Sequence, residues 1–264
     1  MTTNNSLRNT WGSTKDAKFQ TKLVFLIGLP KDATIQSRLE KENQKYHDLV
    51  QGSFIDHYHN MSYKNIMGKL WPSLFCSQAH FIVKTDDDFF VDLYEMYSFT
   101  RSFKNTAQYK QDKFILCPLW TNMQIERDPN SKWYVPFETI PKRGDQDIFL
   151  PYCAGALHIT NPGTANKLVE VAKKNKFFWI DDAWVTGYLA DKLNIEHIGM
   201  EYFTLEPNTF LFQKIIQSPY KQHADYICGP MLRNFELSTA LSEKSRWCHK
   251  HDCLNDIFLK YKNS

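Results

Sequence analysis

The sequence predicts an α/β protein with a mostly parallel, Rossmann-like sheet, helices on both faces and a more irregular C-terminal part. The first observation behind this is that short apolar strands alternate with stretches of helical periodicity in the first half of the chain. The second is size and composition, because 264 residues that are 42% hydrophobic and 15% aromatic can bury a full core. We therefore expect a single domain, residues 1–264.

Strands and helices alternate up to about residue 103. The predicted elements are a strand at 22–27 that ends at Gly28, a helix from 35 to 49, a strand at 53–56, a helix from 62 to 74 kinked by Pro72, and a strand at 80–84. Strands that alternate with helices in this way are typical of parallel sheets, because a parallel connection needs a crossover segment.

The second half of the chain is more irregular. It predicts strands at 114–119 and 154–160, a turn at Asn161-Pro162-Gly163, a helix at 165–172 and a helix from about 181 to 193. The last sixty residues give little periodic signal. No internal repeat or linker divides the chain.

Charge and hydropathy exclude two classes of protein. The formal net charge of +3 is small, and positive and negative residues are evenly mixed. The charge of the chain therefore does not predict a nucleic-acid partner. The longest apolar run, Leu23 to Leu29, is far shorter than the roughly 20 residues that span a bilayer. As given, the chain is expected to be soluble.

The cysteine pattern favours an oxidising compartment. Six cysteines are an even number and none forms a Cys-x-x-Cys pair, so disulfides are plausible. Cys248 and Cys253 flank two histidines, but zinc-finger spacings are missing, which favours a short disulfide loop or free thiols over zinc. Asn-x-Ser acceptors at Asn4 and Asn60 fit a glycosylated lumenal protein.

Three adjacent carboxylates, Asp86, Asp87 and Asp88, follow the predicted strand at 80–84 and precede another apolar stretch. They repel one another, and ligands bind beyond the carboxyl ends of strands in open α/β sheets. A divalent cation that bridges to substrate phosphates would relieve this repulsion. The alternative is a solvated acidic turn, which the apolar flanks make less favourable.

A second acidic pair, Asp181 and Asp182, stands at a predicted helix start between Trp179 and Trp184. A carboxylate in this position can act as a general base. The same residues also suit an ordinary helix N-terminus, where acidic side chains interact favourably with the helix dipole. The segment alone leaves both interpretations open.

Several segments in order carry a family signature: Leu7-Arg8-Asn9-Thr10-Trp11, Phe25-Leu26-Ile27-Gly28, the stretch from Asp48 to Lys64, Lys84-Thr85-Asp86-Asp87-Asp88-Phe89-Phe90-Val91, Tyr152-Cys153-Ala154-Gly155, and the pair Asp181-Asp182. In this order they resemble glycosyltransferase family 31, the β1,3-galactosyl-, N-acetylglucosaminyl- and related transferases with a GT-A fold. The resemblance covers roughly residues 7 to 200. Each segment is weak by itself, and the ordered set is specific.

The resemblance implies an inverting, metal-dependent hexosyltransferase that moves galactose or an N-acetylhexosamine from a UDP-sugar, in β1,3 linkage. It implies that Mn²⁺ or Mg²⁺ is held at Asp86 and Asp88, with His197 as a further ligand. It implies that Asp182 is the catalytic base that removes the proton of the acceptor hydroxyl. It assigns donor binding to Arg8, Lys84, Asp86, Asp87 and Gly155.

The resemblance also implies an organisation and a location. Residues of about 7–100 would form the nucleotide-sugar half, and about 101–264 the acceptor and catalytic half. The acceptor would be a glycan on a glycoprotein or glycolipid, met on the lumenal side of the Golgi membrane. The family places an apolar strand and a membrane anchor before the Leu7 segment, so the chain is expected to be N-terminally shortened.

Two alternatives remain from the sequence. The chain could be an inactive sugar-binding relative that lacks a strand of the sheet. It could also be a haloacid-dehalogenase-type phosphatase, in which an Asp-x-Asp also follows a strand, although Phe89-Phe90 after Asp88 does not match that class. A transferase is expected to turn over a nucleotide sugar and the two alternatives are not, so this measurement distinguishes them.

Overall fold

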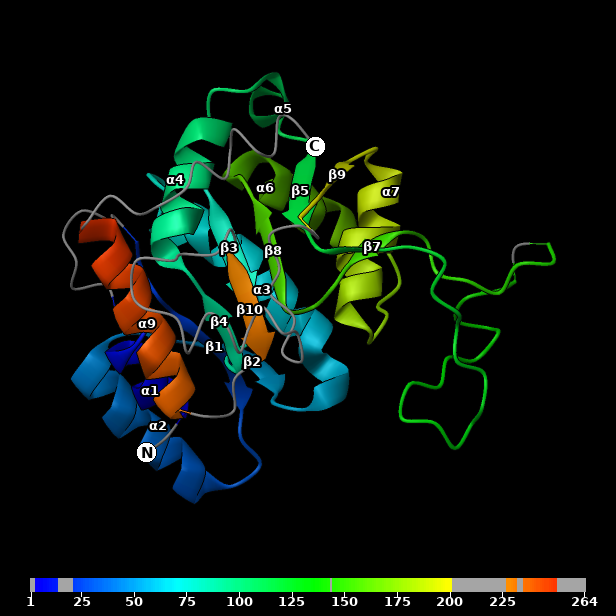
Figure 1. The fold of residues 1–264 in the computed structure, drawn as a ribbon. Helices are drawn as coiled ribbons and strands as arrows, with labels where there is room; N and C mark the ends of the chain where they lie inside the picture. Colours follow the sequence, from blue (N-terminus) through cyan, green and yellow to red (C-terminus); the bar gives the residue numbers. More distant parts are fainter. Residues whose placement is uncertain (1–2, 14–20, 143, 201–226, 232–234, 251–264) are drawn as a thin grey trace. The chain divides into compact units, whose positions relative to one another are not determined.

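The computed structural model describes residues 3–13, 21–142, 144–200, 227–231 and 235–250 (Figure 1). It divides into two compact units that interleave along the chain. Unit 1 comprises Met1–Phe25, Thr85–Gln111 and Met200–Ser264, and unit 2 comprises Leu26–Lys84 and Asp112–Gly199. The single-domain organisation stays a prediction.

Unit 2 is centred on a four-stranded sheet with the order β3-β8-β5-β9 (Figure 1). The strands are β3 (Ile82–Thr85), β5 (Phe114–Cys117), β8 (Leu157–Thr160) and β9 (Glu196–Gly199). β5 pairs in parallel with β9 and antiparallel with β8. The α/β class is confirmed, but this sheet is mixed where the sequence predicted a mostly parallel one. The reason is that β8 inserts between β3 and β5, and an apolar strand carries no local signal for its direction.

A second pair of strands in the chain, β1 (Phe25–Leu29) and β2 (Leu49–Ile55), flanks helix α2 (Ala33–Tyr46). Asp32 caps α2 by accepting a hydrogen bond from Thr34 N at 2.7 Å. A Cβ atom at Gly28 would lie 2.7 Å from Phe54 O, so only glycine permits the close approach of the two strands. The sequence predicted a strand at 22–27 that ends at Gly28, whereas β1 runs through this glycine to Leu29.

Helices α3 (Met61–Phe75) and α6 (Pro162–Ala172) pack against each other in unit 2. Asn161 caps α6 through a 2.9 Å hydrogen bond from Thr164 N, and Pro162 occupies the first turn. Asn161-Pro162-Gly163 therefore begins a helix, where the sequence predicted a separate turn. The short helix η1 (Tyr58–Asn60) precedes α3, and the Asn60 amide donates to Ile55 O at 2.8 Å.

The edge of unit 2 carries β6 (Leu119–Trp120) and β7 (Tyr152–Cys153), which pair antiparallel. A disulfide joins Cys117 to Cys153. Between β6 and β7 a long loop projects away from the strands of the unit (Figure 1). The chain then forms a π-helix, η2 (Asp182–Leu189), which continues into α7 (Ala190–Lys192), where the sequence predicted one helix from 181 to 193.

Unit 1 contains the helices α1 (Thr3–Asn9), α4 (Leu93–Phe103), α5 (Ala107–Lys110) and α9 (Phe235–Lys250) and the strands β4 (Phe89–Val91) and β10 (Cys228–Met231). β4 pairs antiparallel with β10. Asp92 caps α4 and also accepts a 2.7 Å hydrogen bond from Ser245 on α9. Cys248 is disulfide-bonded, which rules out a free thiol there, and Cys253 lies outside the described residues. Within the described ranges, no helix combines the length and apolarity that a membrane span needs.

Candidate active site

Asp182 is the first residue of the π-helix η2 in unit 2. π-helical turns are rare and occur frequently at functional sites. The buried hydroxyl of Thr186 donates to Asp182 O at 2.7 Å and accepts from Cys153 N at 2.9 Å. These two bonds fix the start of η2 against β7, so the acidic pair and the Tyr-Cys-Ala-Gly segment are held together.

Gly155 lies directly under the Asp182 carboxylate. A Cβ atom at position 155 would clash with Asp182 Oδ2 and lie 3.0 Å from its Cγ, so a glycine is required for this approach. Lys84, at the end of β3, donates a hydrogen bond to the carbonyl oxygen of the same glycine. Three residues predicted from separate sequence segments, Lys84, Gly155 and Asp182, therefore meet in unit 2.

Tyr152 lies beside this group and is 7% exposed. Burial, with a further contribution from the negative charge of Asp182, raises the pKa of the Tyr152 hydroxyl to about 12. The phenol therefore stays protonated at physiological pH. Sequence reasoning quoted Tyr152 as part of a segment and gave it no role.

His197 lies on β9, where its Nε2 atom is 2.5 Å from the Thr186 carbonyl oxygen. This is the same threonine whose hydroxyl bonds to the Asp182 carbonyl oxygen. A metal bound through Nε2 would have to replace the contact to Thr186. Nδ1 is the ring nitrogen that takes no part in this contact. The predicted role of His197 as a metal ligand stays a prediction.

The three adjacent carboxylates occupy the turn between Thr85 and β4 in the chain. Asp87 is exposed, whereas Asp86 and Asp88 are half-buried, and Phe89 N bonds to Asp86 O at 3.3 Å. In the described ranges no three His, Cys, Asp or Glu side chains cluster as a complete metal site. Two carboxylate side chains still fit Mg²⁺ or Mn²⁺, since such ions prefer oxygen ligands and commonly complete their shell with substrate phosphates and water.

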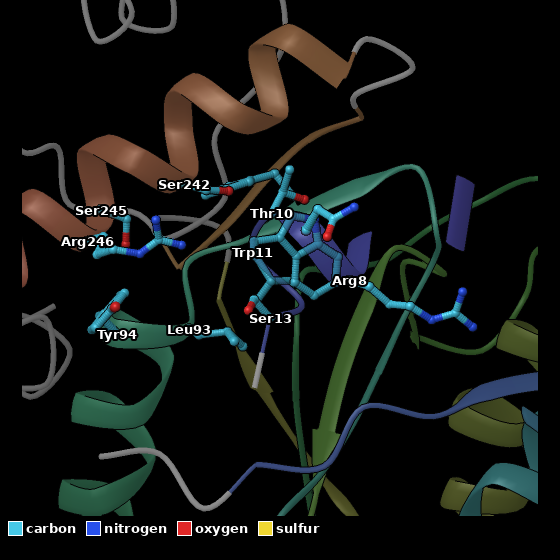
Figure 2. A pocket seen from close by; sticks show the side chains of 12 residues that line it. Arg8, Thr10, Trp11, Ser13, Leu93, Tyr94, Ser242, Ser245 and Arg246 are labelled. Atoms are coloured by element: carbon cyan, nitrogen blue, oxygen red, sulfur yellow. The ribbon is translucent and has the colours of Figure 1, made fainter. Parts of the chain in front are cut away.

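Unit 1 also contains a pocket of about 370 Å³ (Figure 2). Its lining joins two of the family segments, because Thr10 and Trp11 from the first segment face it together with Phe90 and Val91 after the triple carboxylate. Helix α9 contributes Ser242, Ser245 and Arg246, and α4 contributes Leu93 and Tyr94.

Arg8 is among the lining residues of this pocket, yet its side chain points away from the other labelled side chains (Figure 2). Its guanidinium lies 4.9 Å from the centroid of the Phe25 ring, and Nη1 donates to Asn5 Oδ1 at 2.9 Å. The predicted donor-binding role of Arg8 stays a prediction.

Sequence reasoning missed a cluster of aromatic side chains that includes Trp179, three residues before Asp182 in the chain. This aromatic patch comprises Tyr58, His59, Trp133 and Trp179. The rings of Trp133 and Trp179 are stacked, with centroids 5.8 Å apart and planes at 15°. Tyr58 is 38% and Trp133 46% exposed, so part of this aromatic patch is open to solvent. Trp133 lies in a loop without periodic signal, so its partners could not be deduced from the sequence.

A family model described as galactosyltransferase matches residues 3–201. The chain therefore belongs to the galactosyltransferase family and is a glycosyltransferase, which confirms the family predicted from its segments.

The chain is similar to individual β-1,3-galactosyltransferases. It is 28% identical over 228 residues to beta-1,3-galactosyltransferase 1 of Mus musculus, an alignment that covers 83% of this chain and 67% of the relative. It is 30% identical over 218 residues to beta-1,3-galactosyltransferase 5 of Homo sapiens, with 80% of this chain and 67% of the relative covered. These relatives support a hexosyltransferase of the galactosyltransferase type.

Proposed function

We propose that this enzyme transfers a hexose, with galactose as the first candidate, from a UDP-sugar to a hydroxyl of a glycan acceptor in β1,3 linkage with inversion. The observation that carries the proposal is the convergence of Lys84, Gly155 and Asp182, in which a carboxylate lies so close to a glycine that a larger residue would displace it. The names of the relatives support galactose and the linkage.

In this proposal Asp182 is the general base. Its carboxylate removes the proton of the acceptor hydroxyl while that oxygen attacks the anomeric carbon from the face opposite the departing nucleotide. One displacement of this kind inverts the anomeric centre. The protonated hydroxyl of Tyr152, whose pKa is raised to about 12, can only act nearby as a hydrogen-bonding group and does not compete as a base.

The proposed metal ion is Mn²⁺ or Mg²⁺, held by Asp86 and Asp88, with His197 as a proposed further ligand. When bound, it would stabilise the negative charge that develops on the leaving diphosphate. Asp87 would face the donor sugar or ribose. Arg8 and Lys84 would supply positive charge for the donor, and Lys84 already holds the Gly155 carbonyl.

The aromatic patch supports a sugar acceptor. The faces of Tyr and Trp rings offer large, rigid apolar areas with a negative quadrupole, which suit the C–H face of a pyranose ring. Lys132 lies 4.2 Å from the Tyr58 ring centroid and adds a hydrogen-bond donor at its margin. We propose an acceptor glycan on a glycoprotein or glycolipid, met in the lumen of the Golgi.

The test is a panel of UDP-sugars with Mn²⁺, read as UDP release with and without glycan acceptors, and with the product linkage determined by NMR. We expect UDP-galactose turnover that Asp182→Asn lowers about a hundredfold or more, the usual scale for a positioned base. Asp191→Asn, an exposed carboxylate on α7, is the matched control and should keep wild-type turnover.

Each alternative has its own outcome in this panel. Binding of a nucleotide sugar without turnover would indicate an inactive sugar-binding relative, and cleavage of phosphomonoesters would indicate a phosphatase. Normal transfer by Asp182→Asn together with loss in Asp181→Asn would assign the base to the neighbouring carboxylate.

A further inference from the structure

Lys69 is a buried lysine on helix α3, with only 2% of its surface exposed. Removing an ammonium group from water is costly, so a buried lysine is rare unless charges around it compensate the loss of hydration. Burial first, and the positive charge of Lys84 second, lower the pKa of the Lys69 amine to about 7. A buried lysine of this kind reduces the stability of the fold, so we look for its role in function.

The charges that favour protonation of Lys69 come from the acidic pair of η2. Asp181 and Asp182 both raise the pKa of Lys69 through Coulomb attraction, against the effect of burial. The attraction is mutual, so a protonated Lys69 also favours the negative charge on Asp182.

Helix α3 presents a second polar side chain to the same acidic pair. Asn65 donates from its Nδ2 atom to Asp181 Oδ2 at 2.8 Å. Asn65 and Lys69 are four residues apart, which places them on one face of α3. Helix α3 packs against η2. It therefore holds the Asp181 carboxylate by a hydrogen bond and also supplies a positive charge that attracts the acidic pair.

The hydrogen-bonding partner of Lys69, His158, cannot compensate its charge. His158, on β8, is 1% exposed, and its Nδ1 atom lies 3.4 Å from Lys69 Nζ. Burial, then the charges of Lys69 and Lys84, lower the pKa of the His158 ring well below its usual value. His158 is therefore neutral and acts as a hydrogen-bond partner, while the compensating negative charge comes from Asp181 and Asp182.

We propose that Lys69 is a positioning residue for the base of the transfer reaction: its buried ammonium group keeps Asp182 ionised and oriented against Gly155. This inference rests on the proposed role of Asp182 as general base. The groups that face Lys69 in unit 2 are His158 on β8, Lys84 on β3 and the two carboxylates at the start of η2.

The kinetic test compares wild type with Lys69→Met between pH 5 and 7.5. Below about pH 7 the Lys69 amine is protonated, so its removal should move the acidic limb of the kcat/KM profile upward by about one pH unit. On that limb kcat falls about tenfold, and the donor KM stays unchanged. Lys244→Met removes another buried lysine, on α9, and should leave the profile in place.

A structural role for Lys69 predicts different results. If Lys69→Met changes the melting temperature but keeps the acidic limb of wild type, Lys69 supports only the fold and the proposal is overturned. His158→Gln keeps a neutral partner and should leave the acidic limb in place. An equal shift of the limb in His158→Gln would also overturn the assignment to Lys69.

A measurement without turnover keeps this inference separate from the proposed function. In ¹³C-labelled enzyme, the carboxyl signal that is lost in Asp182→Asn should titrate about one pH unit higher in Lys69→Met than in wild type. If no UDP-sugar is turned over but this shift is seen, the proposed function fails and the electrostatic link between Lys69 and Asp182 stands. An unchanged titration would overturn the link itself.

Discussion

Substitution of Gly155 by alanine tests the approach of Asp182 to the glycine. The added Cβ would lie 3.0 Å from Asp182 Cγ and 3.2 Å from Oδ1, and would clash with Oδ2. Ordinary contacts of this kind are about 3.5–4.0 Å, so the carboxylate must move by roughly 0.5–1 Å. A misplacement of about 1 Å can lower a rate about a hundredfold.

We therefore expect Gly155→Ala to lower kcat about a hundredfold while destabilising the fold by about 1–3 kcal/mol, as overpacking usually does. The assay is UDP release with acceptor at saturating donor, combined with thermal melting. Gly144→Ala is the matched control: it has φ of +62° with nothing within 4 Å, so it should cost backbone strain and leave kcat unchanged. Wild-type kcat in Gly155→Ala would refute the argument that this contact positions the base.

The remaining predictions concern the metal, the disulfide and the pH dependence of stability. Asp88→Ala should abolish turnover without lowering Tm, and excess chelator should have the same effect on wild type; full activity in chelator would contradict the metal proposal. Cys117→Ser should destabilise the fold by about 4 kcal/mol, as the loop-entropy estimate gives for a sequence separation of 36, measured by denaturant unfolding of the oxidised and reduced forms. The pKa of Lys69 is lowered on folding to about 7, so the folded state binds fewer protons than the unfolded state between about pH 7 and 10.5, and wild type should gain stability relative to Lys69→Met as pH rises through that window. Parallel stability curves for the two proteins would contradict the burial of a charged Lys69.

The sequence predicted the class of fold and the segments of the site because both have local signatures. The strand that ends at Lys84 and the acidic pair at Asp181-Asp182 are short patterns that can be recognised in one place. The segment Tyr152-Cys153-Ala154-Gly155 was recognised in the same way, and the structure adds why its glycine is required.

The residues that were missed have no local signature. Lys69 lies within an ordinary amphipathic helix, where a lysine is expected on the solvated face, and only packing of α3 against η2 reveals that it is buried. His158 is an isolated histidine in a strand. The direction of β8 and the helical start at Asn161 were also set by tertiary packing and capping, which periodicity does not report.

The interleaving of the two units has a consequence for synthesis of the protein. Strand β4 is fully buried, and its partner β10 pairs Cys228 with Val91, so more than a hundred residues must be made between them. At about 5–20 residues per second, β4 would wait roughly 7–27 s for this partner on the ribosome. Leu26–Lys84 precedes β4 in the chain, and Asp112–Gly199 is made within that interval. Unit 2 can therefore fold first, while the apolar β4 needs protection from aggregation until the C-terminal part of unit 1 arrives.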